Sequence, residues 1–446
     1  MIELPPPSED RSPKNINLLT IFTKLKTLLL GNAARKGYLS TIDQAVISLA
    51  NFVASIFLAR VAIQTEFGIF SVGLDAVHLV RAVQEGLIIT PLNTFGAPME
   101  KEEFKKYAST SVIFQLILAV LSAVAAASLG YILTKTGNDT AGPAIFALWF
   151  IFSTWQLQEY IRRMLYTRGR VGGAILNTII TNVVRLVYMV WIFLHGELTG
   201  IEGLNAVAWG SLVGALIGTW QAREYWTFKI LKPYQTWLRD WKFGRWMVGG
   251  TIANWMTLEF YPIMAAGFVS FAAAGAYNAI QNLVGPIHLL LRATDTFLMP
   301  HSAKEYARNG HKGARRSMNL AYLFTGIPIL AMLVLVSIFA KPLLHLLYGD
   351  TYVNVAGGVP LMALFYFLWF LYWPLQVAFK SSHMSKPIFI ANIIAVASMF
   401  TVGIWAIHKW NVYGTIAGQA LNSLIICIVL WLFWRNLKKN KINEKE

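Results

Sequence analysis

Long apolar stretches separated by short polar segments recur along the chain from Leu39 almost to the C-terminus. Each stretch is close to the roughly 20 residues that a helix needs to cross a bilayer. We interpret twelve of them as membrane-spanning helices, at 40–62, 67–95, 107–134, 142–161, 172–194, 203–222, 246–268, 273–301, 318–340, 358–379, 387–407 and 412–434. The pattern therefore predicts an all-α polytopic membrane protein.

The segments between these spans alternate in positive charge. Of the 38 Lys and Arg residues, 31 lie in the two tails and in the segments after even-numbered spans, whereas only three lie in the segments after odd-numbered spans. The remaining four lie within spans. Lys and Arg are retained on the cytoplasmic side of a membrane, so both termini are predicted to be cytoplasmic and the number of spans to be even.

The charge pattern divides the chain into two halves of six spans. We predict a cytoplasmic tail at 1–38, a six-helix bundle at 39–222, a cytoplasmic linker at 223–245, a second six-helix bundle at 246–435 and a basic cytoplasmic tail at 436–446. The first tail is apolar on one side and carries Lys on the other, which predicts an interfacial amphipathic helix; a flexible tail is the alternative. The linker is basic and aromatic, as expected of a segment near lipid headgroups.

Short similarities between the halves indicate an internal duplication, which is common among transporters. "FGIF" at Phe67–Phe70 resembles "AGAY" at Ala274–Tyr277, and each opens the second span of its half. With six spans in each half, both halves enter the membrane from the same side. The two bundles are therefore predicted to be related by a parallel pseudo-two-fold repeat, with its axis along the membrane normal.

Ionisable residues interrupt the apolar pattern of the second and eighth spans. Those of the second span fall within an arc of about 120° on a helix: Asp75, His78, Arg81 and Glu85. Those of the eighth span share a narrower arc: His288, Arg292 and Asp295. Charge that faces lipid is costly, so the two stripes are predicted to line one polar cavity between the halves.

Three arginines within the predicted spans require an anionic partner: Arg81, Arg185 and Arg292. Arginine stays protonated when buried, and its planar guanidinium suits phosphate oxygens. Arg185 has no acid nearby in the sequence, so its partner must come from elsewhere in the fold or from a substrate. Arg81 and Glu85 are spaced i, i+4 and can instead form a structural pair, and Arg292 can pair similarly with Asp295.

The remaining ionisable groups have two interpretations each. His78 and His288 are either cavity-lining groups that help to bind an anionic ligand or hydrogen-bonded packing residues. Four acids are candidates for ion coupling or charge balance: Asp75, Glu85, Glu259 and Asp295. Glu259 can equally pair with one of the arginines. Asp43, close to the start of the first span, is interpreted as a helix cap or an interfacial charge.

Composition and motifs exclude several classes of protein. The chain is 56% hydrophobic and 13% charged, about half the charged fraction of a soluble domain. The net charge of +16 is distributed over loops, which argues against a nucleic-acid partner. One cysteine permits no disulfide within the chain, and no ATP-binding loop, metal-ligand spacing or nucleophile motif is present. No cofactor or metal is therefore expected, and active transport would require an ion gradient of H⁺ or Na⁺.

The chain resembles the Wzx-type polysaccharide transporters, the bacterial flippases for lipid-linked oligosaccharides, within the multidrug/oligosaccharidyl-lipid/polysaccharide exporter superfamily. The resemblance rests on twelve spans in two halves and on "ARVAIQTEFGIFSV" (Ala59–Val72), which is similar to the family's run through a short turn. "KPLLHLLYGDTY" (Lys341–Tyr352) is similar to the family's external segment after the ninth span. These motifs are apolar and identify the family rather than the substrate.

The resemblance implies a MATE-like fold and translocation of a polyprenyl-pyrophosphate-linked oligosaccharide across the bacterial cytoplasmic (inner) membrane by alternating access. The glycan would serve surface polysaccharide synthesis (O-antigen, exopolysaccharide or capsule), and a polysaccharide polymerase and chain-length proteins are the implied partners besides membrane lipid. The proposed substrate contacts are Arg81, Arg185, Arg292, His78 and His288. Three alternatives stay open: a cation-coupled multidrug antiporter of the same superfamily, a flippase for the peptidoglycan precursor, and a membrane polysaccharide polymerase or ligase.

Overall fold

The computed structural model describes residues 32–382, 384 and 386–443. The amphipathic helix predicted for the first tail lies outside the described residues. The side chains of Arg292 and Asp295 also lie outside what the structure describes, although their backbone is helical.

All regular elements in the described part of the chain are helices, and no strand is present there. In chain order they are α2 (Asn32–Val61), α3 (Gln64–Gln84), the π-helical turn η1 (Glu85–Ile89), α4 (Thr90–Gly96), α5 (Lys101–Lys135), α6 (Ala141–Thr167), α7 (Val171–His195), α8 (Gly200–Gln221), η2 (Arg223–Tyr225), α9 (Pro233–Phe268), α10 (Phe271–Val284), α11 (Pro286–Phe324), α12 (Gly326–Ile338), α13 (Ala340–Tyr348), η3 (Gly349–Val355), α14 (Gly358–Ser381), α15 (Lys386–Ser398), the π-helical turn η4 (Met399–Gly403) and α16 (Ile404–Asn443). The predicted all-α class is confirmed.

Helical residues cover each of the twelve predicted spans. Seven described stretches are long and apolar enough to cross a membrane, and the stretch Lys386–Asn436 contains two predicted spans. The four predicted spans that fail this test are 67–95, 142–161, 246–268 and 273–301. All four carry ionisable residues within the helix.

Two sharp reversals occur inside long helical runs. Gly310 in α11 has φ 57° and Asn411 in α16 has φ 50°, values in the left-handed region that glycine adopts without strain and asparagine adopts more readily than most residues. The first reversal separates the predicted eighth and ninth spans, and the second separates the eleventh and twelfth. The chain therefore reverses at Gly310 and at Asn411, and each of these long runs consists of two helices joined by a tight turn.

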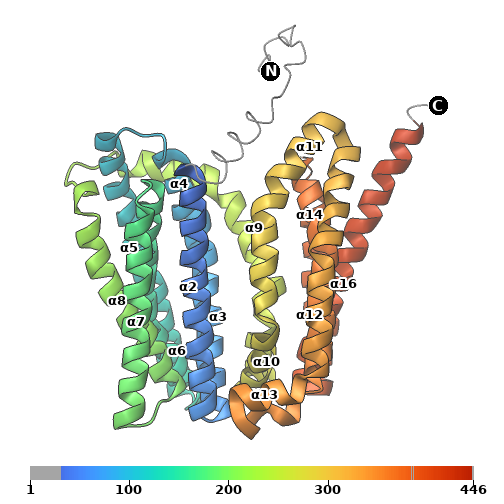
Figure 1. Ribbon diagram of the computed structural model, residues 1–446. Coiled ribbons are helices and arrows are strands. Elements are labelled where there is room, and N and C mark those ends of the chain that lie inside the picture. Colours follow the sequence, from blue (N-terminus) through green and yellow to red (C-terminus); the bar gives the residue numbers. More distant parts are fainter. Residues whose placement is uncertain (1–31, 383, 385, 444–446) are drawn as a thin grey trace.

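The helices form two groups (Figure 1). In the first group α5 packs on α6, α6 and α7 pack on α8, and α2 packs on α7; in the second group α11 and α16 pack on α14, and α15 packs on α16. α3 lies between the groups, because it contacts α6 and α8 as well as α9 and α10. In Figure 1 the groups meet at the end that carries α13 and stand apart at the opposite end, where α2 begins and α16 ends.

The contact between α3 and α10 depends on two glycines. A Cβ added at Gly68 would lie 1.7 Å from the carbonyl oxygen of Phe271, and one added at Gly275 would lie 2.6 Å from the carbonyl oxygen of Gln64. Gly68 and Gly275 occupy matching positions in the two similar sequences that open the second span of each half. Equivalent residues that touch each other are expected beside a two-fold axis, in agreement with a duplicated architecture.

α9 begins inside the segment predicted as a linker and continues through the predicted seventh span. Its first half packs on the first bundle, where the Tyr107 hydroxyl donates to Oδ2 of Asp240 at 3.0 Å. Burial raises the pKa of the Asp240 carboxyl, although the neighbouring Arg239 partly offsets this effect. Further along the helix, the Thr251 hydroxyl donates to the carbonyl of Ala82 in α3 at 3.0 Å. α9 is therefore fixed to α3 over several turns.

Glycines also bring α8 close to α7. A Cβ at Gly210 would lie 2.4 Å from the carbonyl oxygen of Thr181, and one at Gly214 would lie 2.1 Å from the Thr181 hydroxyl. Asn177 Nδ2 donates to the carbonyl of Gly214 at 2.7 Å. Small residues spaced by four allow helix backbones to approach closely within membranes, and here they bring polar groups of both helices into reach of one another.

We expect Gly210→Ala to destabilise the protein by about 1–3 kcal/mol, the usual cost of inserting atoms into a packed interior. The new methyl group meets backbone rather than a flexible side chain, so α8 must move away from α7. Thermal unfolding in detergent measures the effect. Gly172→Ala in α7 is the matched control, since a Cβ there meets nothing within 4 Å; equal loss in both variants would contradict the packing argument.

Candidate functional site

Polar groups of α3 and α9 meet at the boundary between the two bundles. Nδ1 of His78 lies 2.8 Å from Oε2 of Glu259. Asp75 completes a set whose possible ligand atoms all lie within 4.8 Å of one another. We refer to Asp75, His78 and Glu259 as the interface cluster. The sequence predicted that Asp75 and His78 line a shared polar region, and it gave Glu259 only as a candidate for ion coupling or charge balance. The structure brings all three into one site.

The polar atoms of the interface cluster are incompletely satisfied. The facing atoms of His78 and Glu259 are close but are not aligned as a hydrogen bond, and Oδ2 of Asp75 has no hydrogen-bond partner in the described part of the chain. Both the His78 and Glu259 side chains are partly exposed. The unsatisfied atoms themselves are buried, and they retain capacity to bind a proton or another cation.

Helix geometry positions the interface cluster. Asp75 and His78 are three residues apart, which places them on one face of α3. On α9, Trp255 Nε1 donates to the backbone carbonyl of Asp75 at 3.1 Å. Glu259 follows Trp255 by four residues and so lies on the same face one turn later. The indole contact thus aligns Glu259 with the polar stripe of α3.

Arg81 lies on α3 one turn beyond His78. It acts electrostatically on Glu259 in α9 and on Glu159 in α6. Within the described residues it forms no ion pair at 4.0 Å or less. In particular, the ion pair between Arg81 and Glu85 that the sequence allowed does not form among the described residues. Arg81 as a whole is partly exposed, and its guanidinium is not held by a carboxylate of the described residues.

A buried ionic network lies beside Arg81, and the sequence analysis did not predict it. Arg162 Nη1 donates to Oδ2 of Asp43 at 2.6 Å, and its Nε and Nη2 donate to both carboxylate oxygens of Glu159. Arg163 Nε donates to Oε1 of Glu159 at 2.7 Å, and Nη2 of the same arginine lies 3.7 Å from Oε2 of Glu85. The network links α2, α6 and η1, so it ties the first bundle together at the end where α2 begins.

The interpretation of Asp43 as a helix cap or interfacial charge is wrong. α2 begins eleven residues earlier, at Asn32, and the Asp43 side chain is fully buried. Besides Arg162, the Tyr166 hydroxyl donates to it at 2.6 Å. The signal that identifies the network is the spacing of Glu159, Arg162 and Arg163, which predicts i, i+3 and i, i+4 pairs once α6 is extended to Thr167.

His288 of α11 packs in an aromatic site of the second bundle. Its Nε2 lies 2.5 Å from the Tyr366 hydroxyl, and its ring lies 4.9 Å from that of Trp369. It also acts electrostatically on Glu259. His288 therefore has the hydrogen-bonded packing role that was one of its two interpretations, while it stays close enough to the interface cluster to influence its charge.

Arg185 is not part of the interface cluster. Its side chain is 4% exposed inside the first bundle, where Nη1 donates to Oδ1 of Asn51 at 2.6 Å and the guanidinium lies 5.8 Å from the ring centroid of Phe70. No carboxylate forms an ion pair with it in the part of the chain that the structure describes. The sequence correctly predicted a lack of local acidic partners but grouped Arg185 with residues that lie elsewhere.

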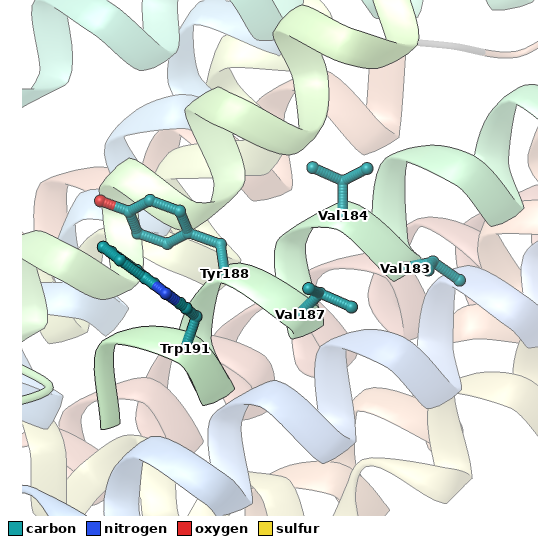
Figure 2. Close-up of a pocket in the computed structure, with 5 residues that line it drawn as sticks. All are labelled: Val183, Val184, Val187, Tyr188 and Trp191. Carbon is teal, nitrogen blue, oxygen red and sulfur yellow. The ribbon is translucent and has the colours of Figure 1, made fainter. Parts of the chain in front are cut away.

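One pocket of about 340 Å³ lies on α7. Figure 2 shows that Val183, Val184, Val187, Tyr188 and Trp191 line it, and all come from this one helix. Several of these side chains are exposed, and the lining contains no charged group. On a membrane-spanning helix such a surface contacts lipid. This pocket is therefore not the site of the polar chemistry.

The family model described as "Polysaccharide biosynthesis protein" matches residues 33–304. No curated protein matches the chain. Among solved structures, an inward-facing multidrug resistance MATE family transporter of the MOP superfamily is 14% identical, with a TM-score of 0.67 over 89% of this chain and 95% of that chain.

Two further structures are similar over most of their length. A MOP superfamily transporter from Pyrococcus furiosus Vc1 is 15% identical, with a TM-score of 0.60 over 90% of this chain and 94% of that chain. The lipid II flippase MurJ in an inward closed conformation is 14% identical, with a TM-score of 0.60 over 88% of this chain and 86% of that chain. At these identities the likeness shows the fold, and it confirms the predicted MATE-like architecture.

Proposed function

The chain belongs to the polysaccharide biosynthesis protein family, and on this premise we propose that it is a flippase that moves a polyprenyl-pyrophosphate-linked oligosaccharide from the cytoplasmic to the external leaflet. The observation that supports this most strongly is Arg81, a partly exposed arginine between the bundles without an ion pair in the described residues. A guanidinium in such a position suits the oxygens of a pyrophosphate.

The surroundings of Arg81 fit a substrate that binds and leaves. Glu159 and Glu259 act on it from two helices and balance its charge when no ligand is bound. A fixed ion pair would instead have to be broken at each cycle. The lipid chain of the substrate needs no polar partner and would stay in the bilayer, while His78 and His288 contribute hydrogen-bonding capacity near the bound head group.

The contacts between the bundles support an alternating-access cycle. Gln64 Nε2 donates to the carbonyl of Thr351 at 2.6 Å, and Gly68 and Gly275 permit close backbone contact at the same end. By the charge pattern of the loops this end is external and both termini are cytoplasmic. The described conformation would therefore receive substrate from the cytoplasmic side, and separation of α3 from α10 would release it externally.

We further propose that the interface cluster couples this cycle to a cation, with a proton favoured over Na⁺. Hard cations such as Na⁺ prefer oxygen ligands, whereas His78 presents a ring nitrogen to Glu259. Histidine changes charge near neutral pH, and a shared proton requires only these two groups. α9, which is fixed to α3, also packs on α10, α15 and α16 of the second bundle. Protonation of His78 or Glu259 would therefore change how α3 is held against that bundle.

We expect Glu259→Gln to reduce gradient-driven export about 5- to 150-fold, the usual range of a coupling free energy, and to remove its dependence on a pH gradient. The amide cannot share a proton with His78. Uptake into inverted vesicles under imposed H⁺ or Na⁺ gradients measures this. Glu202→Gln is the control, since Glu202 bonds Tyr188 within the first bundle. A Na⁺ gradient that drives export without a pH gradient would contradict the preference for protons.

A cation-coupled drug antiporter is the second candidate, because the interface cluster contains two carboxylates that suit cationic ligands. The cheapest test of both functions is deletion of the gene in its own host. Accumulation of lipid-linked glycan together with loss of surface polysaccharide is expected of the flippase. Unchanged glycans together with new sensitivity to cationic drugs would refute it and favour the antiporter.

A further inference from the structure

Arg185 retains two unfilled donor groups deep inside the first bundle. Its Nε and Nη2 have no hydrogen-bond partner among the described residues, although its side chain is 4% exposed. Arginine does not lose its proton in proteins, and an uncompensated buried charge is strongly destabilising. Asn51 supplies only one neutral oxygen, to Nη1. The charge of Arg185 therefore requires a counter-charge that the described side chains do not provide.

Three hydroxyl groups near Arg185 are also without partners in the described part of the chain: Thr178, Thr181 and Ser211. Hydroxyls in membrane helices commonly donate to the carbonyl four residues earlier, as Thr154 does in α6 and Thr219 does in α8. The three unpaired hydroxyls do not. Their protons are consequently free to point toward another acceptor.

Two of these hydroxyls share one face of α7 with Arg185. Thr178, Thr181 and Arg185 fall within about 60° on α7 at 100° per residue, and a long helical side chain covers the turn before its own Cα, which directs Arg185 toward Thr181. Ser211 belongs to α8, next to Gly210, whose added Cβ would lie 3.2 Å from Cβ of Arg185. The arrangement combines one cation with hydroxyl donors, and no acid takes part.

We propose that Arg185, Thr181 and Ser211, with Thr178 one turn away, form a binding site for a small monovalent anion of the chloride type inside the first bundle. A pyrophosphate head group does not fit, because Ser211 is fully buried, Thr178 is 2% exposed and α8 approaches α7 within glycine contact. The site is thus separate from the substrate path at Arg81. It would stabilise the first bundle and make its stability depend on the anion.

The test uses the full-length protein in lipid nanodiscs, melted in sodium chloride and in sodium gluconate at equal ionic strength. We expect the melting temperature to rise with chloride and to saturate, and crystals grown in bromide to show anomalous density beside Arg185. Thr181→Val keeps the shape of the side chain, and Ser211→Ala makes it slightly smaller. Each variant is expected to weaken the apparent chloride affinity about tenfold, since a bond to a charged ligand is lost.

Thr219→Val is the matched control, because this hydroxyl already donates to the carbonyl of Ala215 at 2.8 Å and its loss should leave the chloride effect unchanged. Equal melting temperatures in the two salts would overturn the proposal, and the donors would then be taken to bond buried water. The proposal would also be overturned if chloride stabilised Thr181→Val and Ser211→Ala as strongly as the wild type. Bromide density found only at other places would overturn it as well. None of these measurements involves transport, so their failure would not affect the proposed flippase.

Discussion

Arg81→Ala is expected to lower export of the lipid-linked glycan by about 30-fold or more while the protein still folds. Truncating one partner of a buried, hydrogen-bonded charge pair costs about 2–5 kcal/mol, and 2 kcal/mol corresponds to roughly 30-fold. Folding should be spared because Arg81 holds no ion pair in the described structure, so no carboxylate loses a direct partner. Complementation of a deletion strain at equal protein level measures the effect.

The matched control is Arg60→Ala, which removes the same charge from an exposed position at the C-terminal end of α2. It should export normally, because Arg60 is remote in sequence from the polar stripe and can extend toward the membrane interface. Arg81→Lys tests geometry: it keeps the charge but lacks the guanidinium fork, so partial export is expected. Normal export by Arg81→Ala would remove the main support for the anion site.

Arg162→Gln is expected to destabilise the protein by about 3–5 kcal/mol, since breaking a buried ion pair leaves an uncompensated charge. Arg162 is bonded to Asp43 and Glu159, and the side chains of all three are at most 6% exposed. The loss of stability in Arg162→Gln should appear as a lower temperature of thermal unfolding. Arg81→Ala, in contrast, should affect transport. A double variant with Asp43→Asn is expected to be less unstable than the sum of the single variants, because the two residues share a network.

Lys101→Gln provides the comparison between buried and exposed ion pairs. Lys101 lies 2.7 Å from Glu224, as close as the buried pairs, but the two side chains are 52% and 40% exposed. The hydrogen bond from Lys101 lowers the pKa of Glu224, yet exposed pairs contribute only about 0–1 kcal/mol. Similar losses for Lys101→Gln and Arg162→Gln would show that burial does not set the strength of the network.

The membrane class and the positions of the spans were predictable because hydropathy and loop charge act along the sequence. The same reasoning identified the stripe of α3 and the acid of α9, since intramembrane charges stand out against apolar neighbours. It could not predict that Glu259 meets His78, because that contact depends on how α9 crosses α3, and the Trp255 bond that fixes this crossing has no sequence signature.

Arg162 was missed for a different reason. It stands just beyond the apolar part of the fourth span, and by composition it belongs to a basic cytoplasmic segment. The structure continues α6 to Thr167 and buries Arg162 against Asp43, more than a hundred residues away. Loop charge therefore predicts a side of the membrane for each segment, but it does not distinguish a solvated arginine from a buried one.

The most direct test of the account is translocation in purified proteoliposomes that contain a polyprenyl-pyrophosphate-linked oligosaccharide. A glycosidase that cannot cross the membrane would report the fraction of glycan exposed in the outer leaflet over time. The account predicts that the protein makes nearly all of the glycan accessible, that a pH gradient accelerates the process, and that Arg81→Ala vesicles resemble protein-free vesicles. Glycan that stays half protected in vesicles with folded wild-type protein would contradict the central claim.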